Sequence, residues 1–257
     1  MNFLHSIILG AVEGFTEFLP ISSTAHIILT SRILGLAESE FLKTFTIVIQ
    51  FGAILAVVAL YWRTFLKDWE TVKRIIVAFI PTAIIGFGLY KIIKGFFLVY
   101  IPLILASLFI GGAFLIVFEV FYKKSPMSKN ASEIISYKKA FLIGLAQSLA
   151  VIPGVSRAAA TIIGGLLLGI ERKTIVEFSF LLAAPTMAAA AGYDFLKNFS
   201  EFSTNQFDTL MVGFLASFIF AMLGIKFLLN YIGKKSFAGF GVYRIILAVL
   251  FFFLLMI

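Results

Sequence analysis

A small set of ionisable side chains lies inside long apolar stretches of this chain. Its members are Glu13, Glu17, His26, Arg157, Lys226 and Arg244. A charged side chain at the centre of a bilayer costs about 2.5 to 3.5 kcal/mol on insertion scales, so each charge needs a partner or a function. These residues are therefore the first candidates for chemistry.

Two carboxylates stand close together near the N-terminus. Glu13 and Glu17 are four residues apart, which places them on one face of a helix. Like charges at this spacing repel unless a cation or a shared proton lies between them. The cation could be a divalent metal, Mg2+ or Ca2+, which prefers hard oxygen ligands, or it could be Arg157. A purely structural ion pair between glutamate and arginine is the alternative interpretation.

Two proline-containing breaks place hydroxyl groups beside these charges. The first break spans 20–24 (PISST), and the second spans 153–157 (PGVSR). A serine at such a break commonly just caps the next helix, but the N–H groups of a helix N-terminus also bind anions. Arg157 adds a planar guanidinium that suits phosphate oxygens, and His26 follows Ser23 by three residues, where it could serve as a base. Together these groups suit phosphoryl transfer.

The composition indicates which elements position these residues. The chain has 257 residues, of which 61% are hydrophobic and only 13% are charged, against about 25% charged in an ordinary soluble domain. A soluble globular protein is therefore excluded. The chain has no cysteine, so covalent catalysis would use a hydroxyl, an imidazole or a carboxylate. The net charge of +8 comes from cations flanking apolar runs, so we expect no nucleic-acid partner.

Six apolar stretches are long enough to cross a bilayer, over about 42–62, 75–91, 99–122, 174–196, 210–230 and 238–257. Two other apolar regions, 3–34 and 139–169, are broken in the middle, and each arm is short for a crossing. Backbone that is not helical survives at membrane depth only inside protein or beside a wet cavity. We expect an all-α membrane protein with about six transmembrane helices and two re-entrant helical hairpins. Two proline-kinked spanning helices are the alternative.

The two broken regions match each other at an offset of 134 residues. The matched pairs are Gly10 with Gly144, Glu13 with Gln147, Ser22 with Ser156, and Gly35 with Gly169. Each copy would hold one hairpin and three spans, and an odd number of spans inverts the second copy in the membrane. We expect one membrane domain over 1–257 with an inverted-topology repeat: repeat 1 over about 1–122, a cytoplasmic loop over about 123–139, and repeat 2 over about 140–257.

The cations are distributed unequally over the two ends of this topology. One end carries thirteen: Arg63, Lys67, Lys73, Arg74, Lys123, Lys124, Lys129, Lys138, Lys139, Arg172, Lys173, Lys234 and Lys235. The other carries five: Arg32, Lys43, Lys91, Lys94 and Lys197. Cytoplasmic loops collect Lys and Arg, so this ratio places both termini outside and the 123–139 loop in the cytoplasm.

The two breaks and their flanks resemble the signatures of a known family. The stretch 13–26 (EGFTEFLPISSTAH) and the stretch 153–161 are similar to those of the undecaprenyl-diphosphate phosphatases of the bacitracin-resistance type. The likeness covers nearly the whole chain, including 43–50 and 177–182. One departure lies in the second signature, where the family commonly reads Ser-Arg-Ser-Gly-Ala-Thr and this chain has three alanines, 158–160, before Thr161.

The resemblance implies a plasma-membrane enzyme with its active site open to the outer side. It would remove the terminal phosphate of a polyprenyl diphosphate and return the carrier lipid to cell-wall synthesis, conferring bacitracin resistance without an organic cofactor. The implied catalytic residues are Glu13 and Glu17 as a metal- or proton-handling pair, Ser23 as nucleophile, His26 as acid/base and Arg157 as diphosphate clamp. The substrate-binding candidates are Ser22, Thr24, Gln50, Gly154, Ser156 and Thr161. Phosphorylation of Ser23, phosphorylation of His26 and direct hydrolysis all stay open.

A polyprenyl-phosphate transporter or flippase is the competing hypothesis. Broken helices at a repeat interface also bind anionic substrates in secondary transporters. Transport alone would not need a dense set of hydroxyl, imidazole and carboxylate groups, which favours the enzyme over both a transporter and a structural scaffold. The expected partners are a lipid diphosphate and the bilayer, and a homodimer stays open.

Overall fold

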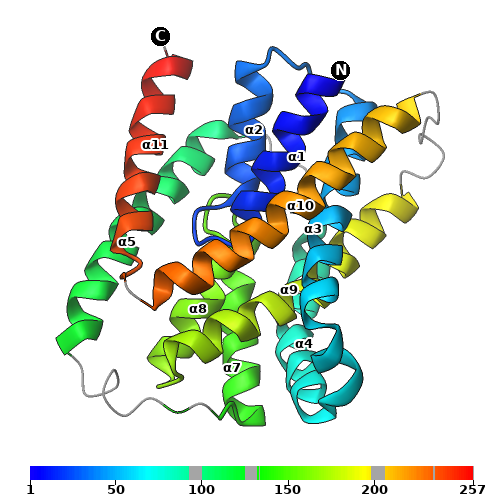
Figure 1. Cartoon of the computed structure of the whole chain (residues 1–257). Coiled ribbons are helices and arrows are strands. Elements are labelled where there is room, and N and C mark those ends of the chain that lie inside the picture. Colours follow the sequence, from blue (N-terminus) through cyan, green and yellow to red (C-terminus); the bar gives the residue numbers. More distant parts are fainter. Residues whose placement is uncertain (93–99, 125–131, 133, 198–205, 234, 257) are drawn as a thin grey trace.

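The computed structural model describes residues 1–92, 100–124, 132, 134–197, 206–233 and 235–256. Over these residues the chain is helical, and its one isolated β-bridge joins Ser132 to Ile170. The predicted all-α class is confirmed (Figure 1). Parts of the predicted organisation lie outside the described residues, namely residues 99 and 257 at the ends of two spans, Lys94, Lys129 and Lys234, and residues 125–131 and 133 of the 123–139 loop.

The helices follow one another in two similar sets. The first set is α1 (Phe3–Glu17), α2 (Ser23–Ile33), α3 (Glu40–Lys67), α4 (Trp69–Ile92) and α5 (Ile101–Lys124). The second set is α7 (Tyr137–Gln147), a 3-10 turn η2 (Ser148–Val151), α8 (Arg157–Leu167), α9 (Arg172–Lys197), α10 (Phe207–Ile232) and α11 (Ala238–Met256).

Five of the described helices are long and apolar enough to cross a membrane. They are α3, α4, α5, α9 and α10, which match five of the six predicted spans. The sixth predicted span forms α11, but its apolar stretch is shorter, so its crossing stays a prediction. Large apolar side chains such as Phe87 and Phe121 are exposed on the helix surfaces, as lipid contact requires. The chain is a multi-pass membrane protein.

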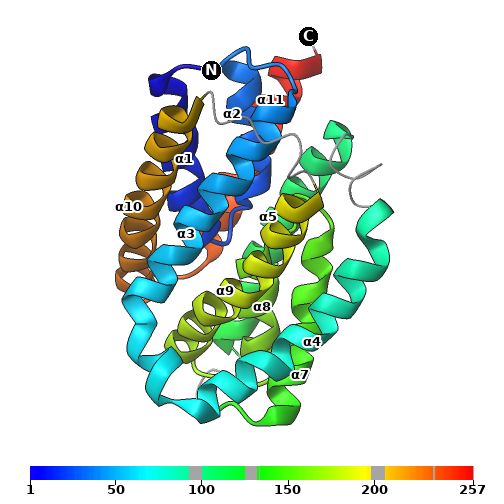
Figure 2. The ribbon, with the colours of Figure 1, turned by 90° about the vertical axis from the view of Figure 1, so that its right-hand side faces the viewer.

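The two broken regions fold back on themselves as helical hairpins. α1 and α2 pack together at the end of the bundle that carries both termini, while α7 and α8 approach from the opposite end (Figures 1 and 2). The tips of both hairpins lie in the middle of the bundle (Figure 1). The alternative of two proline-kinked spanning helices is therefore wrong for these regions.

Local backbone chemistry ends the hairpin arms where the sequence predicts. Pro20 and Pro153 lack an N–H group, so neither can continue a helical hydrogen-bond ladder. At the residue before each second arm, Ser22 and Ser156 adopt φ values of 70° and 76°, in the left-handed region that non-glycine residues rarely occupy. Both tips thus hold a strained serine, a state that persists only where the surroundings impose it.

Small residues let α1 lie directly against α10. A Cβ atom on Gly10 would come within 2.4 Å of the Gly213 carbonyl oxygen, and one on Gly14 within 2.2 Å of the Ser217 carbonyl oxygen. These positions leave no room for a side chain. The close contact fixes the orientation of α1 and therefore of its two carboxylates.

Several features support the predicted inverted repeat. The packing of α1 on α10 corresponds to the packing of α7 on α4. The pairs α3–α9 and α5–α11 each join a helix of the first set to its counterpart in the second. The packing is therefore unchanged when the two sets are exchanged. The left-handed residues also recur at the predicted offset, with Ser22 matching Ser156 and Gly35 matching Gly169. The repeat boundaries and the single-domain assignment stay predictions.

Candidate active site

One carboxylate joins the two hairpin tips. Ser23, the first residue of α2, donates its hydroxyl hydrogen to Oε2 of Glu17, the last residue of α1. Arg157, the first residue of α8, donates to Oε1 of the same carboxylate, from Nη2 at 3.2 Å and from Nε at 3.4 Å. The Glu17 and Arg157 side chains are only 10% and 11% exposed. The structure therefore brings together a hydroxyl, a carboxylate and a guanidinium that the sequence spreads over 140 positions.

Arg157 has a second anchor on α9. Its Nη1 donates to the Ser179 carbonyl oxygen at 2.9 Å, and its guanidinium carbon lies 5.9 Å from the centre of the Phe18 ring. Phe18 in turn packs edge-on against Phe180, with 5.7 Å between ring centres. The guanidinium is thus held at the tip before any ligand arrives, as suits a clamp for phosphate oxygens.

Glu13 lies one turn before Glu17 and is 1% exposed. Its Oε1 has no hydrogen-bond partner among the described residues. A buried carboxylate oxygen without a partner is costly unless a proton or a cation satisfies it. Within the described part of the chain, no three His, Cys, Asp or Glu side chains gather as a metal cluster. Mg2+ commonly takes only one or two carboxylates and completes its shell with substrate phosphates and water, so Glu13 and Glu17 fit such an ion.

His26 is engaged on both of its ring nitrogens. Nδ1 lies 2.7 Å from the Ser22 carbonyl oxygen, and Nε2 lies 2.8 Å from the Tyr243 hydroxyl of α11. A carbonyl only accepts, so Nδ1 carries the hydrogen, and Nε2 of the neutral ring accepts from Tyr243. The two rings also stack, 5.6 Å apart and 8° from parallel. The structure therefore pairs Ser23 with Glu17 and holds His26 against Tyr243, and the acid/base role of His26 stays a prediction.

The tip hydroxyls differ in accessibility. Ser156 Oγ accepts from the Ala159 backbone N–H at 3.3 Å and lies 3.5 Å from the Leu19 carbonyl oxygen, so it caps α8 and contacts the first tip. Ser22 is buried and makes no capping bond with its side chain. Thr24 is exposed in the first turn of α2, so its hydroxyl is open to a ligand.

The other three predicted binding residues either serve packing or make no described contact with the tips. Thr161 is fully buried, and its hydroxyl lies 3.2 Å from Gln147 Oε1 and 2.9 Å from the Arg157 carbonyl oxygen, so it supports α8 from inside. Gly154 has φ of 94°, and a Cβ atom there would meet Ile104 O at 2.8 Å, so glycine permits close contact with α5. Gln50 is half-buried in α3, and no described contact joins it to the tips.

The alanines that replace the usual family residues are buried behind the tip. Ala158 is 0% and Ala159 is 4% exposed, and only the Ala159 backbone N–H takes part in the cap described above. The lost hydroxyl at 158 would therefore sit in a packed position of this chain.

Sequence reasoning missed three contributions to this site. Tyr243 orients His26 from 217 residues away, and the Ser179 carbonyl anchors Arg157. Arg244 was visible as a charge in an apolar run, but its partners were not. A tyrosine in an apolar helix and a backbone carbonyl carry no sequence signal.

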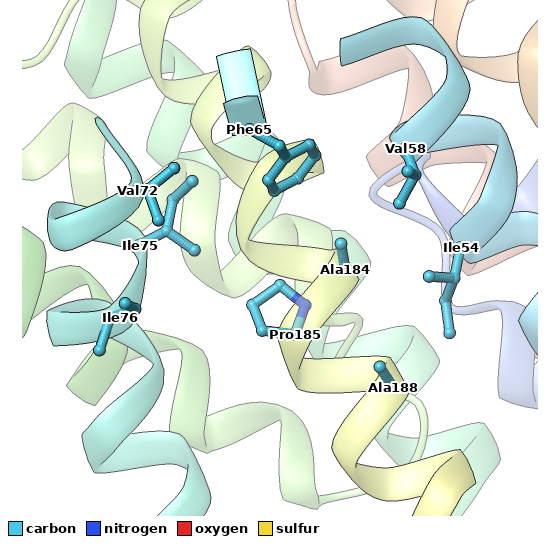
Figure 3. A pocket seen from close by; sticks show the side chains of 9 residues that line it. All are labelled: Ile54, Val58, Phe65, Val72, Ile75, Ile76, Ala184, Pro185 and Ala188. Atoms are coloured by element: carbon cyan, nitrogen blue, oxygen red, sulfur yellow. The ribbon is translucent and has the colours of Figure 1, made fainter. Parts of the chain in front are cut away.

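A separate apolar groove of about 350 Å³ opens between α3, α4 and α9 (Figure 3). Its lining residues are Ile54, Val58, Phe65, Val72, Ile75, Ile76, Ala184, Pro185 and Ala188. All of these side chains are hydrocarbon, so the groove suits an apolar chain and not a phosphate. The Ser23, Glu17 and Arg157 side chains are not among the residues that line this groove.

The fold and the tips define an integral membrane protein in which two helical hairpins bring a serine, a glutamate and an arginine together. The chain belongs to the bacitracin resistance protein BacA family, whose model matches residues 6–250. It is 52% identical over 252 residues to the undecaprenyl-diphosphatase of Sulfurihydrogenibium sp. (strain YO3AOP1), covering 98% of this chain and 99% of the relative. It is 53% identical over 251 residues to the enzyme of that name from Persephonella marina, covering 98% of each. A relative of the same name from Aquifex aeolicus is 49% identical over 247 residues, covering 96% of each chain. The family predicted from the two signatures is confirmed.

Proposed function

We propose that this protein removes the terminal phosphate of undecaprenyl diphosphate and releases undecaprenyl phosphate and inorganic phosphate. The observation that carries the proposal is the Ser23–Glu17–Arg157 arrangement, which combines a nucleophile, a base and an anion clamp at one point. The three relatives named above all bear the name of this diphosphatase. The flippase alternative finds no support among them. The product would return as carrier lipid to cell-wall synthesis, and its recycling would confer resistance to bacitracin.

The geometry suggests how the residues act. The incoming diphosphate competes with Glu17 for Arg157, and phosphate oxygens replace the carboxylate at the guanidinium. The backbone N–H groups at the start of α2 and α8 add further donors for the anion. Glu17, freed from Arg157, keeps its hydrogen bond from Ser23 and can accept the hydroxyl proton.

Ser23 Oγ then attacks the terminal phosphorus, and its proton passes to Glu17. The bond between that phosphorus and the bridging oxygen breaks, so undecaprenyl phosphate leaves and the phosphoryl group stays on Ser23. In the second half, water attacks the phosphoserine and Glu17 returns its proton to Ser23 Oγ. One proton of the water stays on the released phosphate and the other passes to solvent, which balances the reaction.

We further propose that Glu13 and Glu17 hold a divalent cation, Mg2+ or Ca2+. When bound, the ion would neutralise charge on the phosphate oxygens. The unpartnered Glu13 oxygen supports this assignment, since it lies buried one turn from Glu17. Through the bound cation, Glu13 would attract the anionic headgroup. Without the cation, the negative charge of Glu13 would repel it.

The orientation in the plasma membrane is also a proposal. Both termini lie at one end of the bundle, and α7 begins at the other end (Figures 1 and 2). The excess of cations near the α7 end supports a cytoplasmic assignment for that end, which leaves both termini outside. The α1–α2 hairpin then enters from the outer face, and the active site opens there. All groups of the site come from one chain, so the proposal holds for a monomer and for a homodimer.

The test is phosphate release from undecaprenyl diphosphate by the purified protein in detergent. Glu17→Gln and Arg157→Ala should each lose most activity, whereas Lys226→Gln, which changes an exposed charge of α10, should keep it. Full activity of both site variants would overturn the site assignment. Movement of the lipid phosphate across liposomes without phosphate release would overturn the enzyme assignment.

A further inference from the structure

Arg244 of α11 is the largest fully buried side chain among the residues that the structure describes. Its guanidinium has five N–H groups, and each of them faces a backbone carbonyl. The acceptors are Leu108 O for Nε at 3.4 Å, Pro20 O at 3.3 Å and Val155 O at 3.0 Å for Nη1, and Ser107 O at 3.1 Å and Gly154 O at 2.6 Å for Nη2. Every donor of the side chain is therefore used.

The five carbonyls come from three separate parts of the fold. Pro20 belongs to the tip of the first hairpin, Gly154 and Val155 belong to the tip of the second, and the other two belong to α5. α5 makes room for the group with Gly111, where a Cβ atom would lie 2.2 Å from Nη2. Arg244 is thus a physical link between the two tips.

The charge of Arg244 is compensated in an unusual way. Among the described residues no carboxylate forms an ion pair with it, so the carbonyl dipoles alone stabilise the cation. An apolar side chain could fill the same space without this desolvation, so packing alone does not explain an arginine here. Carbonyl oxygens repel phosphate, and three tip carbonyls are turned toward Arg244. With these carbonyls turned away, the backbone N–H groups of the tips can face an anion.

We propose that Arg244 is a positioning residue for the phosphoryl-transfer site. It fastens the two hairpin tips to each other and to α5, which keeps Ser23 and Glu17 of one tip opposite Arg157 of the other. It also withdraws tip carbonyls from the phosphate site. The catalytic consequence rests on the proposed function, whereas the link between the tips does not.

Two measurements test the link and its consequence separately. The chain has no cysteine, so pairs of cysteines can be introduced freely for spin labels. One pair, Thr24→Cys with Ile152→Cys, reports the distance between the tips. A second pair at the exposed Lys67 of α3 and Lys226 of α10 reports the scaffold. Phosphate release is measured in parallel without labels.

In Arg244→Met we expect the distance distribution of the tip pair to broaden while that of the scaffold pair stays unchanged. We expect kcat to fall about 100-fold, as misplacement of reacting groups by about 1 Å can cause, with a smaller change in KM. Arg244→Lys keeps the charge with three donors and should recover part of the kcat and part of the narrow distribution. Gly111→Ala pushes the guanidinium from the α5 side and should broaden the tip pair as well, whereas Gly88→Ala, which meets open space, should not.

An unchanged tip distribution in both Arg244→Met and Gly111→Ala would overturn the proposal, as would an unchanged kcat. Equal broadening of both pairs would also overturn it, since Arg244 would then serve general packing. If the native protein released no phosphate, the proposed function would fail, and the distance measurements would still decide whether Arg244 links the tips.

Discussion

The hydroxyl of Ser23 donates a hydrogen bond to the carboxylate of Glu17, six residues earlier in the chain and across the break of the first hairpin. The residue at helical spacing from Ser23, His26, has turned its ring to Tyr243 of α11. A carboxylate is therefore the base nearest to the hydroxyl. The guanidinium of Arg157 contacts the same carboxylate, so the second hairpin contributes a side chain to the site.

Removal of the proposed divalent ion should abolish activity. A chelator should reduce phosphate release to background, and Mg2+ or Ca2+ added in excess should restore it, because only two carboxylates and the substrate would hold the ion. Glu13→Gln removes one of these ligands and should raise the concentration of metal needed for half-maximal activity by about tenfold or more. A metal titration of both proteins measures this shift. Undiminished activity in the chelator would rule out the metal.

Tyr243→Phe should disturb His26 without removing the ring contact. The variant loses the hydroxyl that His26 Nε2 accepts from but keeps the stacked aromatic face. We expect kcat to fall about tenfold, which is less than the roughly 100- to 10,000-fold that a positioned acid/base group contributes, because the ring of His26 stays in place. Combined with His26→Ala, the effect should be strongly non-additive, because the two residues act as one unit. Additive losses in the double-mutant cycle would show that Tyr243 acts independently of His26.

Gly14→Ala should destabilise the protein and impair the site. The new methyl group would lie 2.2 Å from the Ser217 carbonyl oxygen and 2.8 Å from the Ala221 nitrogen, so α1 must move away from α10. Overpacking of this kind costs about 1 to 3 kcal/mol. Gly88→Ala is the matched control, because its Cβ atom meets open space and alanine is favoured over glycine in a helix by about 0.5 to 1 kcal/mol. Thermal unfolding in detergent should rank Gly88→Ala at or above the native protein and Gly14→Ala below it.

A buried ion pair remote from the tips should matter for stability alone. Glu119 of α5 is 2% exposed and accepts from Arg172 of α9 at 2.6 Å and from the Phe237 backbone N–H at 2.8 Å. Glu119→Ala leaves Arg172 unpaired and should cost about 3 to 5 kcal/mol. Lys43→Ala, which breaks the exposed pair with Glu40, should cost no more than about 1 kcal/mol. Thermal denaturation of the two variants side by side checks this ranking. Equal decreases in their unfolding temperatures would contradict it.

The parts of the site that sequence reasoning located are those that break a local rule. A charge inside an apolar run and a proline at its centre are visible without a structure, which is why Glu13, Glu17 and Arg157 were candidates from the start. The sequence does not show whether the chain turns back or continues after a break, because a hairpin and a kinked spanning helix have the same composition. Only the packing of α1 on α2, and of α7 on α8, decides between them.

The partners of the site residues depend on long-range packing. Helical spacing placed His26 beside Ser23, yet the ring is held by a phenol 217 residues away, and no local pattern encodes that contact. Thr161 was expected among the phosphate-binding hydroxyls, but the fold turns its hydroxyl to Gln147, its neighbour on the preceding arm. The same limit applies to Arg244, whose five acceptors are backbone atoms of three elements.

In the proposed reaction Ser23, activated by Glu17, receives the phosphoryl group. The most direct measurement uses undecaprenyl diphosphate labelled in its terminal phosphate, a rapid quench during turnover, and mapping of the protein-bound label. We expect label on Ser23, no label in Ser23→Ala, and loss of phosphate release in that variant. Label on His26, or phosphate release by Ser23→Ala at the native rate, would contradict it.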